Sequence, residues 1–154
     1  MKILHRITES IRDYALKRLE SPLKSYEKRM INNMGKLYSV IRKGDVVLVE
    51  GQSEISRMIK LFTQSSWSHA ALYVGDELLK REGSLKEKLL HRFGDQAYRM
   101  VIEAFVGKGV IAEPLNKYRD YNFRICRPYG ISSSDLPEVI ADVITSNRTY
   151  MFHR

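Results

Sequence analysis

Five short apolar stretches with strand-like composition lie between residues 44 and 127, and they constrain the fold more than any other feature of the chain. Runs of this kind, bounded by turn residues, are typical of strands. With 154 residues the chain is long enough for one domain with its own core. We therefore predict an α+β fold whose strands are covered by helices. The expected strands are 46–49, 68–74, 100–106, 110–112 and 121–127.

Helical periodicity marks the remaining segments. Apolar residues recur three and four positions apart over residues 3–19, which predicts an amphipathic helix, and a weaker helix is expected from about residue 23 to 34. The charged insertion 77–99 has a helical middle at 85–91. Two more amphipathic helices are expected, one capped by Ser53 and one starting near Ser133 and Ser134. Their apolar stripes are Ile55, Met58, Ile59 and Phe62 in the first and Val139, Ile140, Val143 and Ile144 in the second.

Positive charge is concentrated at the N-terminus. Residues 1–43 hold eleven Lys and Arg against four Asp and Glu, so nearly all of the net charge of +8 belongs to this segment. We expect a basic helical arm over residues 1–43 and a nearly neutral domain over residues 44–154. Interspersed acids are typical of a solvated helix, although a basic amphipathic helix at 3–19 would also suit an anionic membrane surface. Nucleic acid is not expected as a partner, because aromatic and basic residues do not interleave.

Cysteine and histidine usage excludes several kinds of site. Cys126 is the only cysteine, which rules out an internal disulfide and a cysteine-based zinc site, and the four histidines are scattered. We expect neither a metal nor a cofactor. No apolar run approaches the roughly 20 residues of a membrane span, and the N-terminus lacks the apolar core of a signal peptide. The expected location is the cytoplasm, with the inner face of the membrane as an option if the arm binds lipid.

Two polar residues interrupt otherwise apolar strands. His69 opens the stretch 68–74, and Glu103 breaks the stretch 100–106, where a carboxylate is costly to bury without a partner. If the two strands are antiparallel neighbours and the numbers of paired residues sum to an even value, both side chains lie on one face of the sheet, one diagonal step apart. Glu103 would then hold the imidazole of His69 and fix its tautomer. A structural, hydrogen-bonded histidine is the competing interpretation.

Several blocks of the chain resemble the circularly permuted papain-like, NlpC-type cysteine hydrolases. They are GDVVLVEG at 44–51, the helix at 55–62 and TQSSWSHAALYVG at 63–75, followed in order by VIEA at 101–104 and RICRP at 124–128. The nearest branch is the YiiX/YebB-like group, whose members are often labelled lipo-like proteins. The resemblance implies a permuted papain-like antiparallel sheet over residues 44 to about 145.

The resemblance also assigns roles to residues. It implies that His69 is the catalytic histidine and Glu103 the orienting residue of a Cys-His-Glu site. The nucleophilic cysteine would follow at the start of a later helix, and no cysteine of this chain matches it. Cys126 falls in the last strand and is better described as a small half-buried residue. The domain at 44–154 is therefore expected to lack its C-terminal catalytic segment.

Other candidate residues carry weaker signals. Ser65, Ser66 and Ser68 lie near His69, but local hydrogen bonds explain them best. Trp67 and Tyr73 fit a substrate groove and the core equally well. Residues 107–109 are interpreted as a hairpin turn. Lys117, Arg119 and Asp120 are interpreted as a solvated loop.

The expected function follows from these assignments. The family chemistry is acyl transfer from amides or esters through a thiol, and this chain is expected to be inactive for lack of the cysteine. The implied substrate is a small molecule, a peptide or a lipid-type acyl compound. The alternative is a non-catalytic ligand-binding or membrane-surface module that keeps the groove without the nucleophile.

Overall fold

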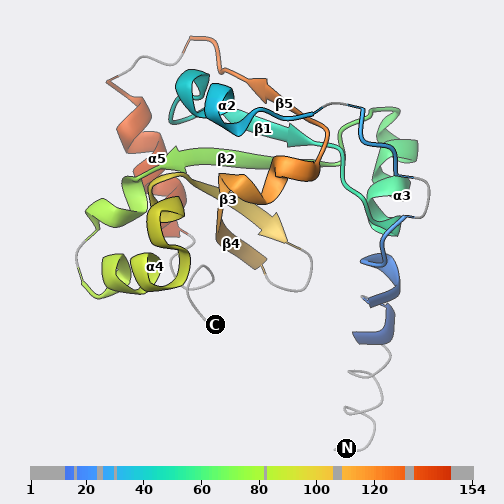
Figure 1. Ribbon diagram of the computed structural model, residues 1–154, viewed down its shortest axis with the longest axis horizontal. Coiled ribbons are helices and arrows are strands. Elements are labelled where there is room, and N and C mark those ends of the chain that lie inside the picture. Colours follow the sequence, from blue (N-terminus) through green and yellow to red (C-terminus); the bar gives the residue numbers. More distant parts are fainter. Residues whose placement is uncertain are drawn as a thin grey trace, which may run out of the picture.

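A computed structural model describes residues 13–15, 17–23, 26–29, 31–81, 83–105, 109–130 and 134–146. Five strands of this part form one antiparallel sheet in the order β4-β3-β2-β1-β5 (Figure 1). The predicted α+β architecture is confirmed. The strands are β1 (Val46–Val49), β2 (His69–Gly75), β3 (Met100–Phe105), β4 (Gly109–Pro114) and β5 (Phe123–Cys126).

Helices connect and flank the strands. They are α2 (Met34–Val40), α3 (Glu54–Thr63), α4 (Leu85–Phe93) and α5 (Leu136–Ser146), with short 3₁₀ segments η1 (Glu77–Lys80), η2 (Gly94–Tyr98) and η3 (Leu115–Asp120). The predicted cap of α3 is confirmed, because the Ser53 side chain accepts a hydrogen bond from the Ser56 N–H. The helix expected in the insertion is α4, and it ends at Gly94, whose positive φ of 55° suits glycine.

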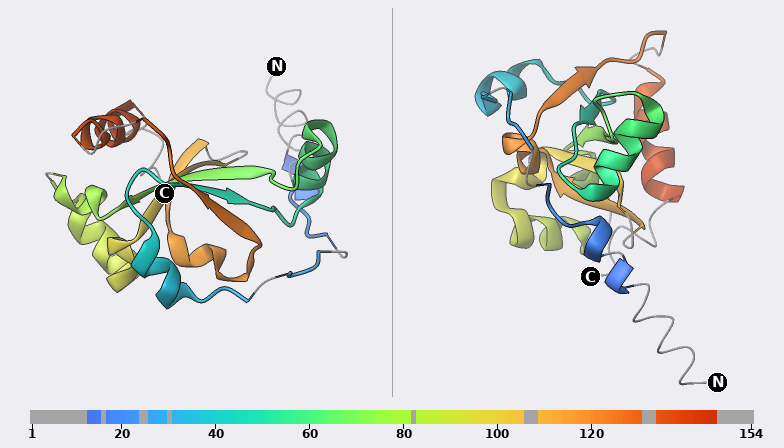
Figure 2. Two further views of the ribbon diagram at one scale, coloured as in Figure 1. Left: turned by 90° about the horizontal axis from the view of Figure 1, so that it is seen from above. Right: turned by 90° about the vertical axis from the view of Figure 1, so that its right-hand side faces the viewer.

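One face of the sheet is covered by α2 and η3, as the left view of Figure 2 shows. The buried core on this face joins Met34 and Leu37 of α2 to residues of the three central strands and to Leu115 and Tyr118 of η3. The contributions of the sheet are Val47, Val49, Ala71, Tyr73 and Val101. Met34, Leu37 and Ile41, which fall within the expected basic arm, therefore belong to this core.

The second face is covered by α5, whose Ile140 and Ile144 are buried. Val139, expected in the same stripe, is exposed. This core continues to the end of the sheet where β2 stops and β3 begins, and there η1, α4 and η2 enclose it. The opposite end, where β2 begins at His69, lies next to α3 (Figure 1).

The helix predicted over residues 23–34 is wrong. The described residues of that stretch are extended or irregular, and α2 begins only at Met34, capped by the Asn33 side chain, which accepts from the Lys36 N–H at 3.0 Å. Tertiary contacts explain the difference. The Asn122 side chain bonds to the backbone of both Glu27 and Arg29 and holds this segment against the loop before β5.

The apolar stripe of α3 is not part of either core. Its residues line a pocket or face solvent, and Ser56 is the only buried residue of the helix. The predicted N-terminal helix lies largely outside the described residues, but 13–15 and 17–19 are helical. Within the described residues, no helix has both the length and the apolarity to cross a membrane.

Candidate functional site

The strand register places the two polar breaks together. β2 and β3 are antiparallel, and Glu103 lies opposite Ala71, two residues along from His69. Side chains two apart on a strand share a face. His69 and Glu103 therefore lie a diagonal step apart on one face, and the predicted register is confirmed.

The two side chains are joined by a hydrogen bond. His69 Nε2 and Glu103 Oε2 lie 2.5 Å apart. The carboxylate is only 3% exposed, whereas the imidazole is half-buried at the wall of the pocket. A buried carboxylate is stable only when its oxygens have partners, and the imidazole is one of three.

The other two partners come from η3. The Tyr118 hydroxyl donates to Glu103 Oε2 at 2.8 Å, and the Lys117 ammonium contacts Oε1. Lys117 is therefore not part of a solvated loop as predicted, because the 3₁₀ turn after β4 brings it over the carboxylate. Asp120 does follow the prediction in being exposed, and it pairs with Lys28. Lys117 and Tyr118 carry no periodic signal in the sequence, since η3 is too short to show one.

These contacts keep Glu103 ionised. Burial alone would raise the pKa of Glu103, but the hydrogen bonds from His69 and Lys117, the Lys117 charge and the Tyr118 hydroxyl outweigh it and lower the pKa from 4.5 to about 2. Burial and the neighbouring carboxylate raise the pKa of Tyr118, which stays a neutral donor. Since an ionised carboxylate only accepts hydrogen bonds, Nε2 of His69 is the donor in this pair, and Nδ1 is the ring nitrogen left outside it.

A pocket of about 300 Å³ opens beside His69. One wall is apolar, from Ile55 and Ile59 of α3, and Phe105, Tyr118 and Tyr121 close it elsewhere. Pockets of this size suit small ligands or one end of a larger one. Tyr73, left open between groove and core, belongs to the core, and Trp67 is not among the described residues that line the pocket.

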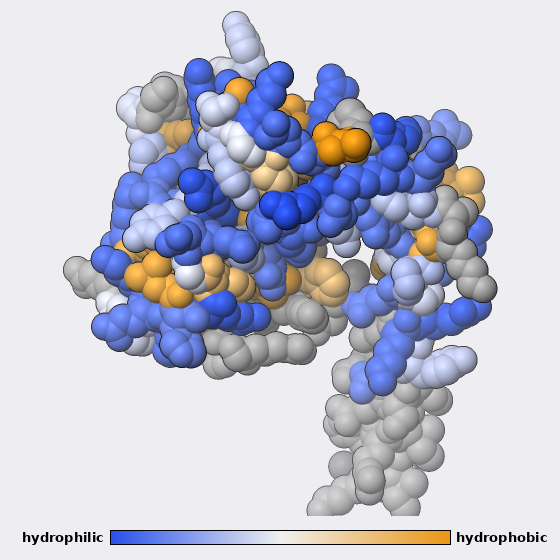
Figure 3. Space-filling model, viewed as in Figure 1, coloured by the Kyte–Doolittle hydropathy of each residue, from blue (hydrophilic) through white to orange (hydrophobic). Residues whose placement is uncertain are grey.

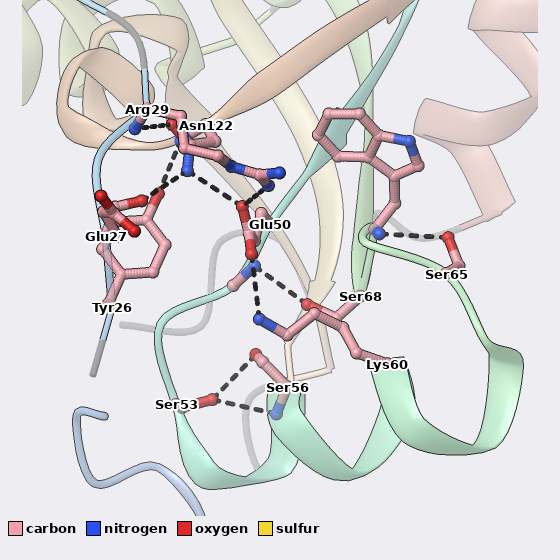
Figure 4. Close-up of polar contacts among 12 residues, drawn as sticks. Tyr26, Glu27, Arg29, Glu50, Ser53, Ser56, Lys60, Ser65, Ser68 and Asn122 are labelled. Atoms are coloured by element: carbon pink, nitrogen blue, oxygen red, sulfur yellow. Dashed lines mark hydrogen bonds and ion pairs between the residues drawn. The ribbon is translucent and has the colours of Figure 1, made fainter. Parts of the chain in front are cut away.

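Of the serines near His69, Ser65 makes the predicted local hydrogen bond, whereas Ser68 bonds to Gly51, 17 residues away in the sequence. Ser68 Oγ accepts from the Gly51 N–H at 2.9 Å, and Ser65 Oγ accepts from the Trp67 N–H (Figure 4). Gly51 has to be glycine, because a Cβ there would lie 2.1 Å from Ser56 Oγ. This close approach fixes α3 next to the strand that carries His69.

A second polar network, shown in Figure 4, ties the N-terminal segment to the same end of the sheet. Glu50 contacts Arg29, Lys60 and the Asn122 amide. Burial would raise the pKa of Glu50, but these three partners lower it. The network joins α3, which lines the pocket, to the segment before α2 and to the loop before β5. The sequence offered no pattern from which to predict it.

Cys126 lies far from His69. It pairs with Val46, at the opposite end of β1 from Val49, which pairs with His69. Three residues of strand span about 10 Å, and β1 lies between the two residues. Val46 and Val49 are three positions apart on β1, so their side chains lie on opposite faces of the sheet. Cys126, opposite Val46, therefore lies on the face away from His69. The only thiol of the chain therefore cannot reach the imidazole.

Comparison with known proteins gives one finding. A family model described as "Permuted papain-like amidase enzyme, YaeF/YiiX, C92 family" matches residues 40–132, which include His69, Glu103, Lys117 and Tyr118. No curated protein and no solved structure matches the chain.

Proposed function

Because the chain belongs to the permuted papain-like amidases of the YaeF/YiiX, C92 family, we propose that His69 and Glu103 are the base and the orienting residue of an acyl-transfer site. The observation that carries this proposal is the hydrogen bond between Nε2 and a buried, ionised carboxylate, which leaves Nδ1 as the basic nitrogen at a pocket. A base held by a third group is the arrangement that activates a nucleophile.

In the proposed reaction a thiol enters the pocket and His69 Nδ1 takes its proton. The thiolate attacks the acyl carbon of an amide or ester, the bond to nitrogen or oxygen breaks, and the imidazolium returns the proton to the leaving group. Water then attacks the thioester with His69 again as base, which releases the acid and the thiol. Glu103 stays ionised throughout and stabilises the imidazolium.

The thiol in this proposal is not Cys126, which lies on the other face of the sheet. In the lipo-like branch, which the chain resembles, the cysteine begins a later helix, and such a helix would bring its thiol into the pocket beside His69. We therefore expect the 154-residue chain alone to hydrolyse amides and esters weakly or not at all. A single cysteine, which cannot form an internal disulfide, fits a reducing compartment, and we propose the cytoplasm as the location.

A second candidate function is ligand binding without turnover. The observation that favours it is an apolar pocket with no thiol of this chain within reach of its histidine. Under this alternative His69 and Glu103 form a fixed polar contact for a small acyl compound and transfer no proton.

Supplying the thiol from solution separates the two functions. With 2-mercaptoethanol and p-nitrophenyl acetate, we expect the wild-type protein to speed acetyl transfer to the thiol with saturation, and p-nitrophenolate release reports the rate. His69→Ala should lose roughly 10²-fold of this acceleration, and Glu103→Gln should lose part of it. The matched control is His91→Ala, because His91 is exposed on α4.

The outcomes decide between the candidates. Equal acceleration by the wild type, His69→Ala and His91→Ala would overturn the proposed base and leave the binding function. Strong hydrolysis without added thiol that Cys126→Ser abolishes would show that Cys126 is the nucleophile after all.

A further inference from the structure

Helix α3 packs on the body of the protein through its polar side. Ser56 is buried against Gly51, and Lys60 reaches Glu50 at 3.2 Å. Surface helices ordinarily bury their apolar stripe and expose the polar one. In α3 this arrangement is reversed.

The apolar side of α3 is therefore left outside both cores. Leu61 and Phe62 are 76% and 81% exposed, and Met58 is 46% exposed. Ile59 continues this surface to the rim of the His69 pocket. Figure 3 shows apolar atoms among charged ones at the edge of the molecule formed by α3. Exposed apolar side chains grouped on one helix suit an interaction surface.

The described end of the N-terminal helix adds to this surface. Backbone hydrogen bonds from Glu54 to Ser21 and from Leu23 to Gln52 join the segment to the start of α3, and both figures show the two helices next to each other (Figures 1 and 2). Tyr14 is 74% exposed. Lys17 and Arg18 are exposed as well. The apolar residues of both helices thus have basic residues beside them.

We propose that α3 and the adjoining N-terminal helix form a docking surface for an anionic lipid bilayer. Met58, Leu61 and Phe62 would enter the interface, while Lys17, Arg18 and Arg57 contact lipid headgroups. Charge favours this occupant over a second copy of the chain, because the net charge of +8 attracts an anionic surface and repels a second copy. Neither His69 nor Glu103 takes part, so the inference is independent of the proposed function.

Docking in this orientation has a consequence for the pocket. Because Ile55 and Ile59 line it, its mouth would lie at the membrane interface. A lipid-type acyl group would then reach the apolar wall without crossing water.

Vesicle sedimentation tests the docking surface. The full chain is mixed with vesicles of phosphatidylcholine alone or of phosphatidylcholine with phosphatidylglycerol, at low and high salt. We expect binding to the anionic vesicles that weakens with salt. The double variant Leu61→Ser/Phe62→Ser should bind about tenfold or more weakly. The matched control is Ile31→Ser, because Ile31 is 96% exposed but lies before α2, away from α3.

Two double variants that remove positive charges test the electrostatic part of the proposal. Lys17→Gln/Arg18→Gln should lower affinity for the anionic vesicles, whereas Lys36→Gln/Arg124→Gln, exposed cations on α2 and β5, should change it by less than about twofold. Circular dichroism of each variant verifies the fold.

Three results would overturn the proposal. They are equal binding of the wild type to both kinds of vesicle, no binding to either, and unchanged binding of Leu61→Ser/Phe62→Ser. A lipid-free dimer that this double variant dissociates would assign the surface to a second copy instead.

Discussion

Two carboxylates are buried in different parts of the sheet, Asp45 just before β1 and Glu103 on β3, and their partners differ in kind. Asp45, just before β1, accepts two hydrogen bonds from the Arg127 guanidinium and one from the Arg42 N–H, all at 2.8 Å. Glu103 is held by an imidazole, an ammonium and a hydroxyl. Both carboxylates are almost fully buried.

The difference lies in what the partners leave available. A guanidinium stays charged at all ordinary pH values and has no basic nitrogen, so the Asp45 pair only fastens β5 to the turn before β1. An imidazole that donates one N–H keeps a second nitrogen for a proton. Of the two buried carboxylates, only Glu103 has a partner with a second ring nitrogen, and under the proposed function that nitrogen is the base.

The largest expected effect is the loss of stability when Asp45 is replaced. Asp45→Ala removes the buried acceptor of three hydrogen bonds and leaves the Arg42 N–H without this partner, so we expect a loss of about 3 kcal/mol in the free energy of unfolding. Urea unfolding measures it, and Asp95→Ala, at an exposed position, should cost less than about 0.5 kcal/mol. If Asp45→Ala left the free energy of unfolding nearly unchanged, the structural role of Asp45 would be contradicted.

Glu103→Gln should cost nearly as much, but only at neutral pH. The folded pKa of about 2 lies below the ordinary 4.5, so the ionised carboxylate stabilises the fold above pH 4.5, and this stability is lost as the pH falls towards 2. The shift corresponds to about 3 kcal/mol. We expect the gap between the wild type and Glu103→Gln in urea unfolding to narrow over that pH range.

The same pH series can contradict the ionised state of Glu103. If the stability curves of the wild type and Glu103→Gln ran parallel from pH 7 to about pH 2.5, Glu103 would not be ionised by its neighbours, and the proposed tautomer of His69 would lose its basis.

Tyr118→Phe should have a smaller effect. It removes the hydroxyl bond to Glu103 Oε2 while His69 and Lys117 remain, so we expect a loss of about 1–2 kcal/mol in stability. The pKa of Glu103 should rise towards its ordinary value, since one stabilising donor is gone. Carbon-13 NMR of labelled glutamate side chains measures this shift. Tyr129→Phe, at a fully exposed tyrosine, serves as the control and should leave it unchanged.

The smallest effect is expected at Cys126. It is half-buried on the face opposite His69, so Cys126→Ser should change stability by about 1 kcal/mol or less and leave thiol-dependent acetyl transfer unchanged. The p-nitrophenolate assay of the wild type and the variant, with and without 2-mercaptoethanol, checks this. A loss of acetyl transfer in Cys126→Ser would contradict the placement of Cys126 and His69 on opposite faces of the sheet.

The sequence by itself determined the strands and singled out His69 and Glu103 as their polar breaks. Alternation along a strand is a local property with a period of two, and the family supplied the expected antiparallel order. The register that places both side chains on one face comes from the structure. The cost of burying a lone carboxylate already required that Glu103 have a partner.

Only the tertiary structure decided the rest of the site. Lys117 and Tyr118 follow β4 in a short 3₁₀ turn without periodicity, and their contact with Glu103 depends on where that turn lies over the sheet. The Asn122 contacts that keep residues 26–29 out of a helix join positions more than 90 residues apart.

Helix α3 shows the same limit most clearly. Its periodicity correctly predicted an amphipathic helix, but the direction of the apolar side was set by Gly51, Ser56 and Glu50, which draw the polar side onto the body. A helical period describes how residues are arranged around their own axis. Which side meets the core depends on the surface that the rest of the chain presents to it.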